Sequence, residues 1–315
     1  MRTLTRSTLP LLAALLLGLA PTGLAQEPES YVRFNILDNK KDGAMQTAVA
    51  TFEHPDKKTK VILYGVVHIA DADFYARVQQ DLDSYTTVLF EGVAPGKEAP
   101  TEADQSLGEL QKAMGEMLGL SFQKDGINYT RKNLVHADMN MDQLKEAMGG
   151  GTISPLGQFM DADQMKNMAP FLKMAAGLGK MLMANNPAMR DQMKMQMGNQ
   201  MAGQDMDKAM GEKMTQAILY DRNRVCLEVL DKQLVKQQDG TIAIFYGAAH
   251  MPDMEKTLAS QGWKRVEKRW MSAWQVGQGI ADGWQAPAGG APQPSTPSTP
   301  TPAPTAPPAD GRRWF

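Results

Sequence analysis

One short pattern occurs twice in this chain, as Ile-Leu-Tyr-Gly-Val-Val-His at residues 62–68 and as Ile-Phe-Tyr-Gly-Ala-Ala-His at residues 244–250. Each copy is a short apolar run typical of a buried strand, which a glycine ends before a stretch at helical spacing. Two of the four histidines, His68 and His250, therefore follow equivalent strands. Side chains at such exits project from the carboxyl edge of a sheet, where open α/β folds build their sites. The alternative is a duplication whose histidines only satisfy backbone groups.

The segments around the two copies predict the fold class. From residue 61 to residue 93 the order is strand, Gly-His turn, helix (73–82) and strand (87–90), and residues 241–270 repeat the strand, turn and helix. Strands that alternate with helices indicate an α/β fold with crossover connections. We expect one domain over residues 31–285, with two related strand-turn-helix halves and a helical insertion at about 101–215.

The amino terminus predicts export. Residues 1–6 are basic, residues 9–20 are apolar, and small residues stand at 23–25, which together are typical of a signal peptide over residues 1–25. The apolar run is shorter than the roughly 20 residues that a membrane helix needs, so we expect no membrane span. The mature protein is then periplasmic or secreted, and an uncleaved anchor is the alternative.

The remaining composition excludes some classes of protein. The chain has a formal charge of −2, and the predicted signal peptide contains Arg2 and Arg6 but no acid, so the mature chain is mildly acidic and poorly suited to bind nucleic acid. The single cysteine, Cys226, cannot form an intramolecular disulfide, and we expect a small buried residue there. Residues 286–315 are rich in Pro, Thr and Ala and predict a disordered tail, either inert or serving as a cell-wall spacer or glycan acceptor.

The predicted insertion holds most of the 24 methionines. A spacing of four residues, which places side chains on one helix face, relates the members of two series: Met189, Met193, Met197 and Met201, then Met206, Met210 and Met214. The simplest interpretation is an adaptable apolar stripe that packs on the sheet or covers a pocket. Two alternatives are cuprous-ion binding at Met193, Met195 and Met197, and a groove for a hydrophobic ligand or peptide.

Glu91 is the first carboxylate that we expect to join the histidines. It follows the apolar strand at 86–90, which would lie parallel to the first strand, so its side chain should emerge at the same edge as His68. Two imidazoles and a carboxylate can hold a divalent cation that activates water. The same groups can perform acid–base catalysis without metal. A helix cap or a surface carboxylate is the alternative interpretation of Glu91.

Two further residues are candidates. Asp138 follows a short apolar segment at 134–136 and lies either at another strand end or at the start of the next helix as its cap. Arg222 interrupts an otherwise apolar helix, where an inward guanidinium would pair with carboxylates or stabilise an oxyanion. A solvated helix face is the alternative for Arg222.

Taken together, these motifs resemble the TraB/GumN family, which belongs with the Tiki metalloproteases, the erythromycin esterases and the ChaN haem-binding proteins. The resemblance covers about residues 31–274. Its specificity comes from the order and spacing of the motifs, which are Gly65-x-x-His68, Glu91-Gly92, Ala137-Asp138, Asp221-Arg222-Asn223 and Gly247-x-x-His250. The family commonly has Glu where Asp221 stands here, which leaves the role of Asp221 open.

The resemblance implies an α/β/α sandwich with both Gly-x-x-His turns and Glu91 at one pocket. By the same carry-over, His68, Glu91 and His250 are metal-site candidates and Arg222 is a pocket residue. From the residues themselves, Glu91, Arg222 and Asp138 are the catalytic candidates. We therefore expect an exported hydrolase, foremost a peptidase dependent on manganese, cobalt or zinc, that acts on a peptide or small-molecule substrate. The alternatives are a metal-independent esterase, a non-catalytic haem or copper carrier, and a cell-envelope interaction module.

Overall fold

The computed structural model describes residues 30–97, 102–149, 174, 177–203, 208, 211–282 and 284. The predicted signal peptide, residues 1–25, and the predicted tail, residues 286–315, lie outside the described residues. Among the helices that are described, none is both long enough and apolar enough to cross a lipid bilayer.

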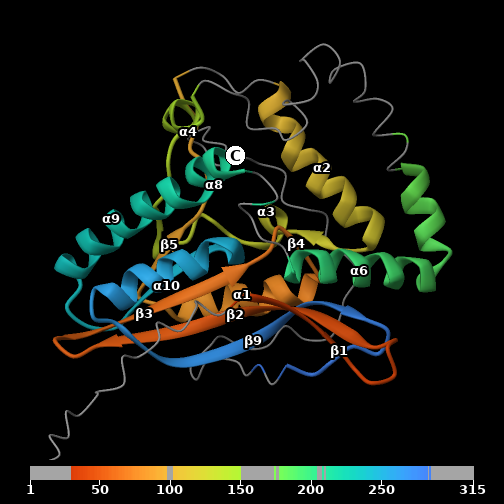
Figure 1. Cartoon of the computed structure of the whole chain (residues 1–315), viewed down its shortest axis with the longest axis horizontal. Helices are drawn as coiled ribbons and strands as arrows, with labels where there is room; N and C mark the ends of the chain where they lie inside the picture. Colours follow the sequence, from red (N-terminus) through yellow and green to blue (C-terminus); the bar gives the residue numbers. More distant parts are fainter. Residues whose placement is uncertain are drawn as a thin grey trace, which may run out of the picture.

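A mixed seven-stranded sheet forms the centre of the protein (Figure 1). Its strands are β1 (Val32–Ile36), β2 (Gly43–His54), β3 (Lys57–Val66), β5 (Thr87–Phe90), β7 (Leu134–His136), β8 (Thr241–Gly247) and β9 (Lys264–Val276). They follow the order β1-β2-β3-β8-β5-β7, and β9 pairs with β2. The strands β3, β8, β5 and β7 are parallel, whereas β2 is antiparallel to β1, β3 and β9. Parallel pairs together with helices confirm the predicted α/β class.

The two copies of the repeated pattern are direct neighbours in this sheet. They form β3 and β8, and the last residue of β3, Val66, pairs with Gly247, the last residue of β8. The turns after them therefore leave the same edge side by side. A Cβ on Gly65 would lie 3.1 Å from the Ala48 carbonyl oxygen and 3.3 Å from Ala248, so glycine at this position permits the close approach of the second turn.

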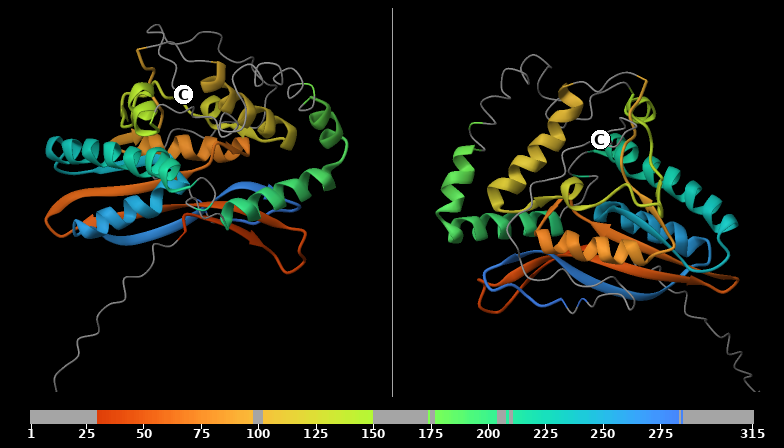
Figure 2. Two further views of the ribbon diagram at one scale, coloured as in Figure 1. Left: turned by 45° about the horizontal axis from the view of Figure 1, so that its top comes forward. Right: turned by 180° about the vertical axis from the view of Figure 1, so that it is seen from behind.

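Helices cover both faces of the sheet (Figure 2). Successive strand residues point to opposite faces, and in β3 Ile62 and Tyr64 join one apolar cluster while Val61 and Leu63 join the other. Helix α1 (Ala72–Ser84) packs on the first cluster, and α9 (Asp221–Lys236) and α10 (Met251–Ser260) pack on the second. The arrangement is a three-layer one with the sheet in the middle.

The range expected to be a helical insertion contains more than helices. Its described helices are α2 (Glu102–Leu118), α3 (Gln123–Gly126), α4 (Met141–Ala147), α6 (Pro187–Ala202) and α8 (Glu212–Thr215). Strand β7 also falls in this range and pairs with β5, and the short strand β6 (Ser121–Phe122) pairs with β4 (Ile69–Ala70). The two strands are only three and two residues long, too short to show a periodic pattern.

The methionines of α6 pack against the protein core. Met193, Met195, Met197 and Met201 are partly buried against the first apolar cluster, as expected for an adaptable apolar stripe. Met189 differs, because it lies at the first turn of α6 and is 45 % exposed. Of the second series, Met214 packs near α4, whereas Met206 and Met210 lie outside the described residues.

Candidate functional site

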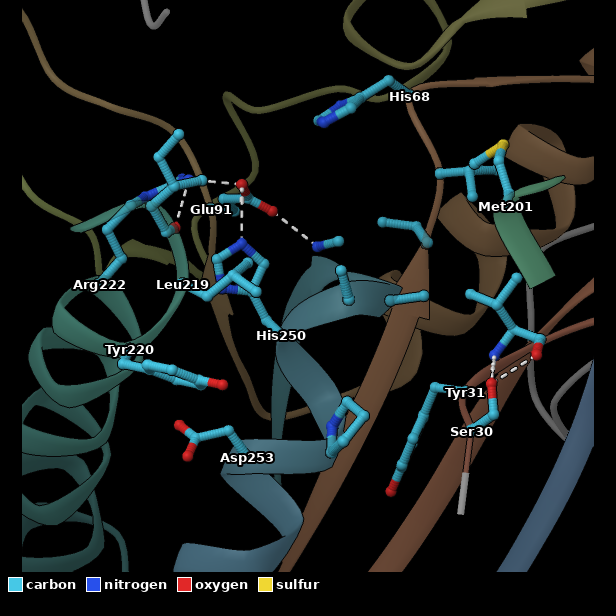
Figure 3. A pocket seen from close by; sticks show the side chains of 18 of the residues that line it. Ser30, Tyr31, His68, Glu91, Met201, Leu219, Tyr220, Arg222, His250 and Asp253 are labelled. Carbon is cyan, nitrogen blue, oxygen red and sulfur yellow. Dashed lines mark hydrogen bonds and ion pairs between the residues drawn. The ribbon is translucent and has the colours of Figure 1, made fainter. Parts of the chain in front are cut away.

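A pocket of about 780 Å³ lies at the carboxyl edge of the parallel strands (Figure 3). Four of the five predicted site residues line it: His68, Glu91, Arg222 and His250. They come from segments far apart in the sequence, and the parallel strands β3, β8 and β5 bring three of them to one edge. The fifth, Asp138, does not line the pocket, and its fully buried side chain contacts Arg222.

Glu91 is a largely buried carboxylate, with a side chain that is 12 % exposed, and it accepts hydrogen bonds on both oxygens. Arg222 Nη2 donates to Oε1 at 2.7 Å, and the backbone N–H of Gly247 donates to Oε2 at 2.6 Å. Burial, the largest single influence, raises the pKa of Glu91, but the positive charge of Arg222 together with the contributions of His250 and His68 outweighs it, and the pKa lies well below its usual value. Glu91 is therefore an anion at neutral pH, and neither a helix cap nor a surface carboxylate.

Asp138 holds Arg222 in place. Arg222 donates from Nε to Oδ1 at 2.9 Å and from Nη2 to Oδ2 at 2.6 Å, a bidentate pair that fixes the plane of the guanidinium. The backbone N–H groups of Gly92 and Met139 also donate to Asp138. With these contacts Asp138 is a positioning residue outside the pocket, and the helix after it is capped instead by Asn140.

A π-helix over Gln216–Tyr220 presents Arg222 to the pocket. It joins α8 to α9, and the backbone N–H of Asp221 donates to the Gln216 carbonyl five residues earlier. Such one-turn π segments widen a helix and recur at functional sites. Arg222 Nη1 donates to the Ile218 carbonyl at 3.3 Å, so most of the guanidinium hydrogens are already used. Asp221 instead accepts from the Gln216 side chain at 3.0 Å, away from the pocket lining.

His250 is oriented by a residue whose role the sequence did not reveal, Asn223. His250 Nδ1 lies 2.6 Å from Asn223 Oδ1, and the amide nitrogen of Asn223 donates to Asp253 at 2.8 Å and to the His250 carbonyl at 3.3 Å. Because the amide oxygen can only accept, Nδ1 carries the hydrogen. The other nitrogen, Nε2, faces Glu91 Oε1 at 3.6 Å, which is longer than a hydrogen bond.

His68 lies across the pocket from His250, with its ring open to the pocket. Its carbonyl accepts from the backbone N–H of Gln123 at 2.8 Å, which ties the turn to α3. His68 is exposed to solvent, and its pKa lies below its usual value chiefly because protein atoms around the pocket partly desolvate the ring; the charge of Glu91 opposes this shift, and Arg222 and Lys124 add to it. His68 is therefore neutral at pH 7 and can accept a proton or bind a metal.

The fit of these residues to a metal ion is limited by Arg222. Both oxygens of Glu91 already accept hydrogen bonds, and a guanidinium occupies the position beside Oε1. Within the described part of the chain, no group of three or more His, Cys, Asp or Glu side chains is arranged to hold a metal. The two imidazoles provide nitrogen ligands, and Glu91 becomes a third ligand only if its contact with Arg222 loosens.

Comparison of the chain with protein-family models, with curated proteins and with solved structures found no match.

Proposed function

We propose that this protein is a hydrolase that uses the pocket around His250, Glu91 and His68 to cleave an ester or amide bond. The observation that carries this proposal is the orientation of His250. Its Nδ1–H is held by Asn223, so the lone pair of Nε2 faces the pocket beside a carboxylate. This is the arrangement that a general base requires: one ring nitrogen is fixed by an acceptor, and the other is available to take a proton.

The proton transfer can be followed from this geometry. A water molecule that contacts both Nε2 and Glu91 Oε1 would lose its proton to Nε2 as its oxygen attacks the substrate carbonyl. The resulting imidazolium would be stabilised by the Glu91 anion at 3.6 Å. Arg222 keeps Glu91 ionised, which is its main contribution, since few of its own N–H groups remain for an oxyanion. The proton then passes from Nε2 to the leaving group.

We extend the proposal to the divalent cation that the family resemblance implies. His68 and His250 would hold manganese, cobalt or zinc, with Glu91 as the third ligand. A bound cation would lower the pKa of a water ligand to about 7 and polarise the carbonyl. A peptidase dependent on this cation and an esterase that works without it are two versions of the same site, and metal content separates them.

Elemental analysis of untagged protein, equilibrated with manganese, cobalt or zinc and then desalted, tests the cation. We expect near-equimolar metal in the wild type and its loss in His68→Ala. His54→Ala is the matched control, because His54 lies outside the pocket against Trp263. Equal metal in all three proteins would overturn the cation site. A wild type that takes up no metal yet hydrolyses esters in EDTA would leave the metal-free esterase.

A further inference from the structure

The pocket that holds the proposed catalytic groups is also lined by apolar residues. We call the following six residues the apolar wall: Tyr31, Met201, Ala202, Ile218, Leu219 and Tyr220. They come from three separate parts of the chain: the segment before β1, the end of α6 and the π-helix. Figure 3 shows Met201 and Tyr31 on the side of the pocket opposite Glu91 and Arg222. In the same view Leu219 and Tyr220 lie on the side of Arg222, so the wall covers both sides of the pocket, and the charged residues Asp253 and Lys256 also line the pocket.

We propose that the apolar wall binds an apolar group attached to the scissile carbonyl, so the substrate is an ester or amide with an apolar acyl group or apolar side chain. This inference rests on the proposed hydrolase function and adds the substrate class. An apolar group gains free energy when it leaves water for such a surface, whereas a charged group would lose its hydration without a partner. The wall therefore selects substrates by the apolar area that they bury.

One short segment, the π-helix, supplies half of the wall. Here Ile218, Leu219 and Tyr220 all line the pocket, in the widened segment that also places Arg222 beside Glu91. Residues of the wall and Arg222 therefore come from adjacent parts of one helical segment.

Met201 makes the opposite side of the wall adaptable. Its unbranched thioether side chain adjusts to ligands of different shape more readily than a branched side chain does. Met201 and Ala202 are the last two residues of α6, whose preceding turns are fixed by the packing of Met193 and Met197 on the core. A firmly packed helix therefore ends in a flexible side chain at the pocket.

The experiment measures kcat/KM for p-nitrophenyl esters from acetate to decanoate, and for amide substrates with alanine or leucine at the acyl position. We expect kcat/KM to rise about fourfold for each added methylene until the wall is filled, the value that follows from burial of one methylene group. Preference for long esters alone would identify an acyl chain as the ligand, and preference for leucine amides would identify an amino-acid side chain.

Two variants test the wall itself. Met201→Glu places a carboxylate in it and is expected to flatten the dependence of kcat/KM on chain length. Met189→Glu, the same substitution at an exposed position of the same helix, is expected to keep the wild-type dependence. Ala202→Phe fills part of the pocket instead, and we expect it to move the highest kcat/KM to esters with shorter chains. This second variant keeps the test available if Met201→Glu does not fold.

Binding separates failure of this inference from failure of the proposed function. Titration calorimetry with decanoate is expected to give a complex with the wild type and a tenfold or greater loss of affinity in Met201→Glu. Binding without turnover of any ester or amide would reject the hydrolase and retain the apolar site. Turnover that does not depend on chain length, together with no decanoate binding, would reject the apolar site and retain the hydrolase.

Discussion

Replacement of His250 by alanine is expected to lower kcat/KM for the hydrolysis of p-nitrophenyl acetate by about 10²- to 10⁴-fold, the usual contribution of a general base. The reason is that Nε2 of His250 is the nitrogen whose lone pair faces both the pocket and Glu91. The loss should appear in kcat, because the ring acts on water rather than on the body of the substrate. Initial rates measured over a range of substrate concentrations give kcat and KM separately.

Asn223→Leu is the companion variant. It keeps a side chain of similar volume but removes the oxygen that accepts from His250 Nδ1 at 2.6 Å. We expect an unchanged KM and a lower kcat, since the ring is present but no longer held in one orientation. Circular dichroism and thermal melting check that both variants are folded. Folded His250→Ala protein with wild-type kcat/KM would reject the proposed general base.

How far the sequence predicts the site depends on where each residue lies. His68, Glu91 and His250 each follow an apolar strand, and the parallel order of strands makes such ends converge, so their proximity follows from the pattern alone. Asn223 could not be assigned a role in this way. Its contact with His250 depends on how α9 packs beside the first turn of α10, and helix periodicity carries no information about that packing.

The strands of the sheet were also predicted only in part from the sequence. The strands β3, β5 and β8 are continuous apolar runs and were predicted, whereas β1, β2 and β9 were not. Strand β2 pairs on both edges and is buried on both faces, yet it contains Gln46 and Thr47, which are 2 % and 0 % exposed. Gln46 is satisfied there by Ser272 of β9 at 3.2 Å. The buried hydroxyl of Thr47 has no hydrogen-bond partner among the described residues. Buried polar residues of this kind interrupt the apolar pattern that would otherwise indicate a strand.

The π-helix was also outside the reach of the sequence. A single extra residue in one turn shifts the phase of the apolar face by about 100°, but α8, which precedes it, has only four residues and is too short to reveal that shift in the sequence. Yet this residue determines which side chains face the pocket, including Arg222. From the sequence, an arginine that points inward from this helix was expected to pair with carboxylates or to stabilise an oxyanion. In the structure Arg222 forms ion pairs with Glu91 and Asp138.

Replacement of Arg222 by methionine is expected to lower the free energy of unfolding by about 3–5 kcal/mol, the typical cost of removing one partner from a buried ion pair. Methionine preserves most of the volume, so the loss reports the charge. Without the guanidinium, Glu91 and Asp138 remain as two buried carboxylates, with side chains that are 12 % and 0 % exposed. Urea denaturation at pH 7 measures the difference.

Arg224→Met is the matched control on the same helix. Arg224 pairs with Glu228 at 3.0 Å, but both side chains are more than half exposed, at 63 % and 54 %. Such surface pairs contribute at most about 1 kcal/mol, so the control should change stability little. A similar loss of unfolding free energy in both variants would show that the buried ion pairs of Arg222 contribute no more to stability than the exposed pair of Arg224.

The pH dependence provides an independent check, because the sign follows from Glu91. Its folded-state pKa lies well below the value of about 4.3 expected for an unfolded chain, so Glu91 stabilises the wild type above that pH and this contribution is lost as the pH falls further. In Arg222→Met the guanidinium, which is the largest of the influences that lower the pKa of Glu91, is absent. Burial then favours the protonated form of Glu91. The deficit of the variant should therefore shrink on acidification from pH 7 to pH 4. A deficit that stays constant over this range would mean that Arg222 stabilises the fold through packing rather than through the charge of Glu91.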